Sequence, residues 1–290
     1  MNPYTIVRIL TTASLATLLF EIGLRLKAQQ VWDAARDWRL LVRLLVANFV
    51  AVPALALGLI QCFGLDRDPA VGMLLLAAAP FAPVVPIFTK LARGDLAQAA
   101  SLTMLFPVFS AFLTPPVCAL GLRAVPGGGA LRFSVLLILA VLLATITLPL
   151  VVGVGVNHVW PRLSRRLQRP IEVVGDAAGA ISLLFVTAVE WPAILQTGWK
   201  PLLAMAMMGE LTMILGYALG GPNPASRRVT AFGTSNRNIA LAILVALGGL
   251  GGTAVLSAVV ACGLLLIFLG LVHVAGWRVA DALRGGSPCA

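Results

Sequence analysis

The stretch Gly233-Thr-Ser-Asn-Arg-Asn238 is a polar run inside an apolar segment that extends from 229 to 249. A second interruption, Pro80-Phe-Ala-Pro-Val-Val-Pro86, lies inside the apolar segment 69–91. Proline removes a backbone donor and clashes with the preceding turn, so this run predicts a broken helix. Irregular backbone at membrane depth is tolerated only where protein or a water-filled cavity surrounds it. Two such breaks in corresponding positions of two halves are typical of an inverted-repeat membrane fold.

The composition places the chain in a membrane. Its 290 residues are 60% hydrophobic and 11% charged, and the mean hydropathy is +0.98. An ordinary soluble domain is about one quarter charged, and a single soluble core stops growing near this size. These values exclude a soluble enzyme, a disordered chain and a secreted disulfide scaffold.

The charges and cysteines suggest no cofactor, metal or nucleic-acid site. The net charge is +10, but the basic residues lie mainly in gaps between apolar runs, where they are expected to set membrane topology beside anionic lipid. The four cysteines form no CxxC pair and have no histidine at metal-ligand spacing. HExxH, a GxSxG elbow, paired aspartates and a phosphate-binding loop are missing, and no His–carboxylate pair is expected within the membrane. We therefore do not expect an enzyme.

About 20 residues are needed for one helical crossing, and the chain offers nine apolar segments of suitable length. They are 5–26, 40–63, 69–91, 97–121, 130–157, 172–193, 199–220, 229–249 and 252–277. The basic residues cluster in alternate loops and in the tail, and positive charge marks the cytoplasmic side. This predicts an all-α, multi-pass protein of the plasma or inner membrane, with the N-terminus outside and the C-terminus inside.

Three motifs resemble the bile acid:sodium symporter family. They are Asn48-Phe-Val-Ala-Val-Pro53, Phe88-Thr-Lys-Leu-Ala-Arg-Gly-Asp95 with the Ser101-Leu-Thr103 that follows, and Gly233-Thr-Ser-Asn-Arg-Asn-Ile-Ala-Leu-Ala242. Their order and spacing also match, so the resemblance covers nearly the whole chain. It implies a panel domain (1–26 and 130–193) and an inverted-repeat core (repeats 40–121 and 199–277), followed by a cytoplasmic tail (278–290). The two broken helices would cross in the core, with breaks at Pro80, Pro83, Pro86 and Gly233.

The sequence departs from the family at the positions where the resemblance would place sodium ligands. Val85 and Pro86 occupy the positions where the family has a Ser-Asn pair. Gly233 occupies the position of a Glu, and Arg237 that of a Gln. Asn48 and Thr103 keep side-chain oxygens, and Asn238 matches the Asn of the second break. Hard cations need several oxygen ligands, usually including a carboxylate, so the usual two sodium ions are not expected. The candidate site for substrate or ion is the set Arg237, Asn238, Asn236, Ser235, Thr234, Asn48, Thr103 and Glu210.

Arg237 lies in mid-span, where an arginine by default marks a functional site with a partner. Two roles remain open at this point: the guanidinium could replace bound sodium and pin the crossing, or it could bind a carboxylate or sulfonate of the substrate directly. Arginine does not deprotonate usefully, so it cannot carry a coupling proton. Glu210, in the middle of its segment, is expected to form an ion pair with Arg237 rather than to relay protons.

The resemblance therefore implies a secondary transporter of a small organic anion that works by alternating access. Sodium or a proton is the coupling ion to be considered, and the lipid bilayer is the other partner. The alternative is a non-transporting membrane sensor or scaffold that kept the fold. Flux into proteoliposomes separates the two functions.

Overall fold

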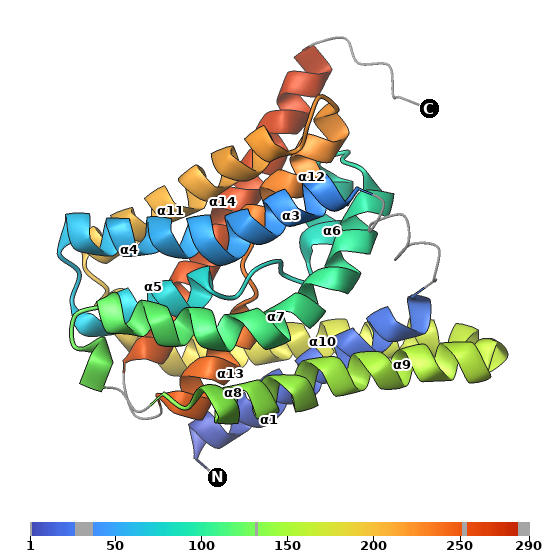
Figure 1. Cartoon of the computed structure of the whole chain (residues 1–290), viewed down its shortest axis with the longest axis horizontal. Helices are drawn as coiled ribbons and strands as arrows, with labels where there is room; N and C mark the ends of the chain where they lie inside the picture. The colour runs from blue at the N-terminus through green and yellow to red at the C-terminus, as the bar shows by residue number, and fades with distance from the viewer. Residues whose placement is uncertain (1, 27–36, 131–132, 251–253, 284–290) are drawn as a thin grey trace.

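The computed structural model describes residues 2–26, 37–130, 133–250 and 254–283. Within these ranges the chain is helical and has no strands (Figure 1). The helices are α1 (Pro3–Arg25), α3 (Trp38–Val46), α4 (Val52–Phe63), α5 (Arg67–Ala77), α6 (Val85–Leu91), α7 (Leu96–Ala124), α8 (Val135–Leu142), α9 (Leu148–Val159), α10 (Pro161–Leu195), α11 (Trp199–Leu219), α12 (Pro224–Ser235), α13 (Ile239–Gly249) and α14 (Val255–Leu283). Parts of three predicted segments, at 131–132, 252–253 and 284–290, lie outside the described residues.

Seven continuous helical spans of the described chain are long and apolar enough to cross a membrane, which confirms an all-α integral membrane protein. Two of these spans join two α-helices through a π-helical turn: α3 and α4 through η1 (Ala47–Ala51), and α8 and α9 through η3 (Leu143–Thr147). The predicted third and eighth segments are each split into two short helices, α5 with α6 and α12 with α13. The count of nine crossings stays a prediction.

The sixth segment differs from its predicted bounds. The basic stretch before residue 172 was expected to be a loop, but α10 already begins at Pro161. Pro161 fits the first helical position, where its missing N–H costs nothing. One face of this early part is anchored on the end of α1, because Ser164 Oγ and Gln168 Nε2 both donate to the Leu24 carbonyl, at 2.8 and 3.0 Å.

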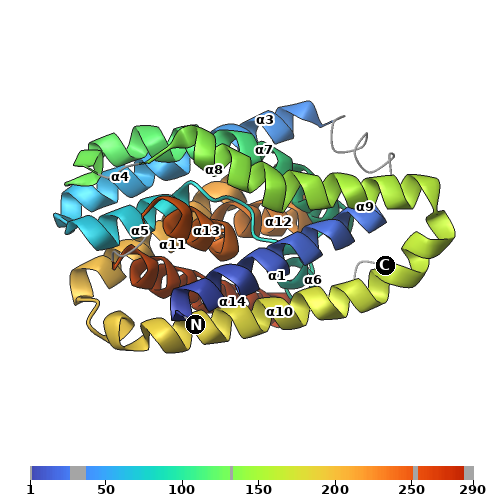
Figure 2. The ribbon, with the colours of Figure 1, turned by 90° about the horizontal axis from the view of Figure 1, so that it is seen from below.

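Helix α1 packs along both α9 and α10, and Figure 2 shows it lying between them. The closest approach to α9 is made by two glycines. A Cβ added to Gly23 would overlap the Leu150 carbonyl oxygen, and one added to Gly153 would overlap the Phe20 carbonyl oxygen. The absence of side chains therefore lets the two backbones touch. We call α1, α8, α9 and α10 the panel group.

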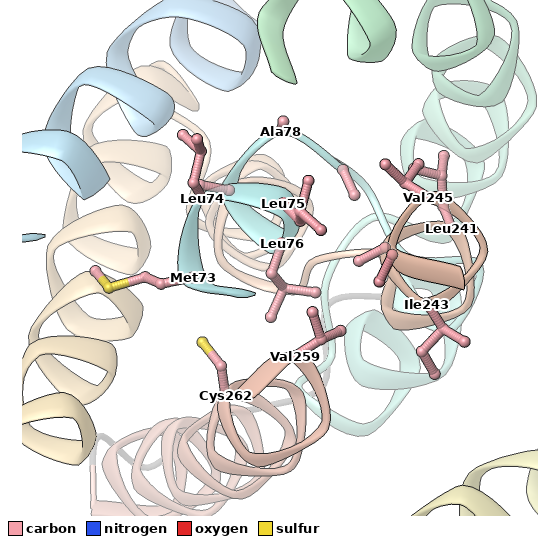
Figure 3. Close-up of a cluster of buried hydrophobic side chains, with 14 of the residues drawn as sticks. Met73, Leu74, Leu75, Leu76, Ala78, Leu241, Ile243, Val245, Val259 and Cys262 are labelled. Carbon is pink, nitrogen blue, oxygen red and sulfur yellow. The ribbon is translucent and has the colours of Figure 1, made fainter. Parts of the chain in front are cut away.

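The larger of the two described clusters of buried apolar side chains joins the remaining helices to the panel group. Figure 3 shows side chains of α5, including Leu75 and Leu76, beside those of α13 and α14, such as Leu241 and Val259. Gly72 of α5 lies so close to α14 that an added Cβ would be 2.6 Å from the Ala258 Cβ. Helix α5, the first half of the first broken segment, is thus packed against the opposite half of the sequence. We call α3–α7 and α11–α14 the core group; its division from the panel as a domain boundary stays a prediction.

Candidate functional site

The two broken segments meet at their breaks. Between α5 and α6, and again between α12 and α13, the backbone leaves the helical hydrogen-bonding pattern. Two main-chain hydrogen bonds join the interruptions: Ala82 N donates to Asn236 O at 3.0 Å, and Asn238 N donates to Ala79 O at 2.8 Å. The structure therefore brings together two stretches that are more than 150 residues apart in the sequence.

The sequence explains most of the first break. Pro80 lacks the N–H that would bond to Leu76 O, so α5 ends at Ala77. Phe81 has a φ of 57°, a left-handed conformation that is uncommon for a bulky residue. Its ring is buried and stacks on Phe106 with centroids 4.5 Å apart. Pro86, predicted to be part of the break, instead lies in the first turn of α6, where proline is tolerated.

Gly233 also differs from its predicted role. It lies inside α12 and is not a break, because the helix continues to Ser235 and the irregular residues are Asn236–Asn238. A Cβ at Gly233 would lie 2.7 Å from Phe81 Cζ and would overlap the rest of that ring edge. The glycine therefore allows the Phe81 ring to pack directly against α12 at the crossing.

Arg237 is 2% exposed and its guanidinium is surrounded by oxygen atoms. Nη1 donates to Asn48 Oδ1 at 2.6 Å and to Thr234 O at 3.1 Å. Nε donates to Leu76 O at 3.2 Å, and Nη2 donates to Asn48 O at 3.3 Å and also to Ala77 O. We call these five acceptors the oxygen cage. Four of them are main-chain carbonyls and none belongs to a carboxylate.

Each carbonyl of the oxygen cage lacks its α-helical N–H partner, although Leu76 O also accepts a turn hydrogen bond from Ala79 N at 3.0 Å. At η1, Val52 N bonds to Ala47 O, and Pro53 has no N–H to offer to Asn48 O. Leu76 and Ala77 end α5, and Thr234 O loses Asn238 N to Ala79 O. The carbonyl ends of α5 and α12 carry partial negative charge, which favours a cation between them. The cage thus suits a buried positive charge without a counter-carboxylate.

A cavity of about 430 Å³ lies between the panel group and the crossing. Its walls come from α1, α10 and α14 and from the broken segments on both sides of the crossing. The lining is mainly apolar, and its polar side chains are Thr11, Ser14, Asp176, Ser182, Asn236, Arg237 and Asn238. The residues of the oxygen cage do not line this cavity, so the hydrogen bonds of Arg237 point into the core group.

The other predicted residues of the second break have separate roles. Asn238 Oδ1 caps α13 by accepting from Leu241 N at 3.0 Å. Asn236 is 2% exposed, and within the described chain its Nδ2 has no hydrogen-bond partner. Ser235 Oγ contacts Met213 Sδ at 3.7 Å, and the buried hydroxyl of Thr234 has no described partner. Thr103 lies on α7, also with an unsatisfied hydroxyl, and is not among the residues that line the cavity or contact Arg237.

Glu210 does not join the crossing, so the predicted ion pair with Arg237 is wrong. Its Oε2 lies 2.9 Å from His273 Nε2, on the adjacent helix α14. The expectation that the chain lacks an intramembrane His–carboxylate pair is wrong for the same reason. Sequence reasoning missed this pair because 63 residues separate its members, and because His273 lies only four residues from the end of its predicted segment, 252–277, where it was interpreted as an interfacial residue.

The panel side of the cavity was also missed. Thr11 Oγ1 and Ser182 Oγ are 2.8 Å apart and link α1 to α10 at the cavity wall. Asp176, expected at the start of a helix, lies instead within α10 and lines the cavity. Small hydroxyl side chains in apolar segments were the available signal, but such residues also occur in helix packing that binds nothing.

The family model of the sodium bile acid symporter family matches residues 12–210, more than half of the chain. The chain belongs to this family. The matched region includes α5, α6 and the panel group, so the first crossing segment and most of the cavity walls fall inside it. The second crossing segment lies beyond residue 210 and is placed by the structure.

Other members of the family that resemble this chain are named as transporters. The human sodium-dependent organic anion transporter is 24% identical over 216 residues, covering 73% of this chain and 55% of that protein. The ileal sodium/bile acid cotransporter of Cricetulus griseus is 24% identical over 210 residues, covering 72% and 58%. An uncharacterized sodium-dependent transporter of Bacillus subtilis, YocS, is 27% identical over 105 residues, covering 36% and 32%. The matched region thus spans little more than half the length of the first two relatives.

Proposed function

We propose that this protein carries a small organic anion across the membrane by alternating access between the panel group and the core group. The observation that carries the proposal is the cavity, which lies between these groups and is bounded by both broken segments. Transport pathways in inverted-repeat proteins run beside such breaks. The names of the relatives support an organic anion as the class of substrate.

The anionic group would be received at the start of α13. Ile239 and Ala240, the first residues of this helix, line the cavity. The first N–H groups of a helix have no helical acceptor, and the dipole places positive charge at the same end. Asn236 also lines this wall, and its buried Nδ2 has no hydrogen-bond partner among the described residues. The apolar remainder of the cavity suits an organic anion with a substantial hydrocarbon part.

Arg237 would act as a permanent cation of the core and not as a substrate contact. All five of its hydrogen bonds go to the oxygen cage, away from the residues that line the cavity. Its charge still favours an anion nearby, because the local dielectric is low. We therefore infer that transport does not require sodium at this position, in contrast to the relatives that are named as sodium-dependent.

The test is uptake by purified protein in proteoliposomes. Radiolabelled taurocholate, toluenesulfonate and hippurate serve as probes, in buffers that contain either sodium or choline. We expect at least one probe to be transported, and to be transported equally well in choline. Asn236→Ala should weaken apparent affinity by roughly 10-fold, since a hydrogen bond to a charged group is lost. Asn223→Ala is the matched control, because this asparagine caps α12 far from the cavity lining.

Two results would contradict the proposal. Failure of wild-type protein to exchange any of the three anions would favour a sensor or scaffold. A steep, cooperative requirement for sodium would show that the usual ions still bind, and that Arg237 does not take the place of one of them.

A further inference from the structure

Glu210 and His273 form an ionisable pair on the outer surface of the core group. Glu210 lies eleven residues beyond the start of α11, and His273 lies one turn beyond Gly270 on α14. At 1.5 Å per residue, Glu210 is about 16 Å from the start of its helix and about 14 Å from its end, which is deep inside a hydrocarbon layer about 30 Å thick. Their side chains are 42% and 28% exposed. Ionisable residues at such depth mark ion pathways or proton relays.

The pair is built to hold one extra proton. A carboxylate can only accept hydrogen bonds, so a neutral His273 must present Nε2–H to Glu210. The other ring nitrogen, Nδ1, is then the atom that binds an incoming proton, and the product is an imidazolium beside a carboxylate. Imidazole is the side chain whose charge ordinarily changes between about pH 5 and 8. This inference rests on the proposed function: we propose that the His273–Glu210 pair binds the proton that is co-transported with the organic anion.

The formal charges of the core group explain how one proton would be coupled to one monoanion. Among Arg237, Glu210 and His273 alone, the arginine contributes one positive charge and the glutamate one negative charge, so this set carries no net charge while His273 is neutral. Binding the anion and a proton together keeps the balance. Binding either one alone leaves a single net charge, which is costly to carry across hydrocarbon. The core is therefore expected to change between its inward-facing and outward-facing states in two forms: empty, or with both the anion and the proton bound.

Two basic side chains of α12 near this pair have described partners. Arg228 of α12 and Asp281 of α14 form a pair at 2.8 Å, which adds no net charge. Arg227 of α12 donates to Gly221 O at 2.5 Å. The other charged side chains on α11, on α14 and on the helices packed against them are Arg39, Arg43, Arg67, Asp68, Lys90, Lys200 and Arg278 of the core group, and Arg162, Arg165, Arg166, Arg169, Glu172, Asp176 and Glu190 of α10.

His273 is also in contact with the crossing through aromatic rings. Its ring centroid lies 5.8 Å from that of Trp277, which lies 5.1 Å from Phe232 on α12. Phe232 is in turn 5.4 Å from Phe88 on α6. A change in the charge of His273 therefore acts on side chains that support both broken segments.

The experiment compares exchange with net uptake in proteoliposomes, using taurocholate, toluenesulfonate and hippurate as probes. In exchange, the core changes between its two states with substrate bound in both directions. In net uptake, it must also return without substrate. For the wild type we expect an inward proton gradient to accumulate the probe, and a potassium–valinomycin voltage clamp to have no effect. His158→Gln, at an exposed position on α9, is the matched control and should behave as wild type.

Two variants should fail in different ways. Glu210→Gln leaves the empty core with one net positive charge, so net uptake should fall by roughly 100-fold while exchange persists without dependence on pH. His273→Gln cannot take up the proton and leaves the anion-bound core negative, so exchange and net uptake should both fall. Retained exchange in Glu210→Gln also shows that this variant is folded.

The outcomes separate the two proposals. If no probe is exchanged by the wild type, the proposed function fails, and the coupling fails with it. If exchange occurs but accumulation follows voltage and not the proton gradient, only the coupling is overturned. Proton-driven uptake that survives in both variants also overturns it.

Discussion

Replacing Arg237 with glutamine should turn the oxygen cage into a site for a free cation. The change removes a buried charge and most of the five hydrogen bonds that the guanidinium makes. Removing one partner from a buried charged network costs about 3–5 kcal/mol. Because the carbonyls of Leu76, Ala77 and Thr234 remain fixed by the breaks in their helices, they would still point toward the vacated position. A small hard cation with oxygen ligands is the natural occupant.

The measurement is thermal unfolding of purified protein in detergent, in sodium chloride and in choline chloride at equal ionic strength. We expect the wild-type Tm to be the same in both salts. The Arg237→Gln variant should have a Tm lower by roughly 10 °C in choline. Sodium at a hundred times its Kd would restore about 2.7 kcal/mol. Arg237→Lys keeps the charge but loses the planar fork of donors. Its Tm in choline should lie between that of the wild type and that of Arg237→Gln.

Either of two results would refute this reasoning. An unchanged Tm in Arg237→Gln would mean that the guanidinium does not stabilise the crossing. A lowered Tm that is equal in sodium and choline would mean that the cage does not bind a cation once the arginine is gone. A loss of substrate affinity with unchanged stability would instead place Arg237 at the substrate, against the geometry of its hydrogen bonds.

Three further outcomes are expected. Gly233→Ala should destabilise the protein by about 1–3 kcal/mol through overpacking against Phe81, and Phe81→Leu should relieve part of that loss; the readout is Tm, and an unchanged Tm would contradict the close contact. Gly153→Ala should separate α9 from α1 and lower Tm, whereas Gly155→Ala, which has open space around its added Cβ, should not; equal effects would argue against a specific contact. A reporter fused after the last residue should be cytoplasmic and one at the N-terminus external, as the loop charges predict, and two reporters on the same side, with the C-terminal one external, would mean that a crossing was miscounted.

The positions of both breaks could be predicted from the sequence, because proline and a polar run each prevent a continuous helix. The acceptors of Arg237 could not. Four of the five are main-chain carbonyls, and side-chain patterns do not show where a carbonyl points. A signal was nevertheless present: Pro53 and Pro80 each lack the N–H that would otherwise occupy one of these oxygens. Counting missing donors near a buried arginine would have located part of the cage.

The partner of Glu210 was predicted wrongly because pairing was judged from its place in the middle of an apolar segment. Asn48, and not Glu210, contacts Arg237. In the structure, α11 presents Glu210 to α14 and not to the crossing. Which neighbouring helix a side chain faces depends on helix rotation, and hydropathy constrains rotation weakly when a helix is apolar all round.

The contact between Gly23 and Gly153 constrains how the panel group can move. The side chains that flank Gly23 on α1 leave a notch for the backbone of α9, and those that flank Gly153 on α9 leave one for the backbone of α1. Sliding α1 along α9 by one residue, about 1.5 Å, would bring a side chain into that notch. The helices can therefore tilt or travel together, but they cannot shear past one another. Relative motion of any size must take place where the walls of the cavity meet, or in the connections that join the two groups.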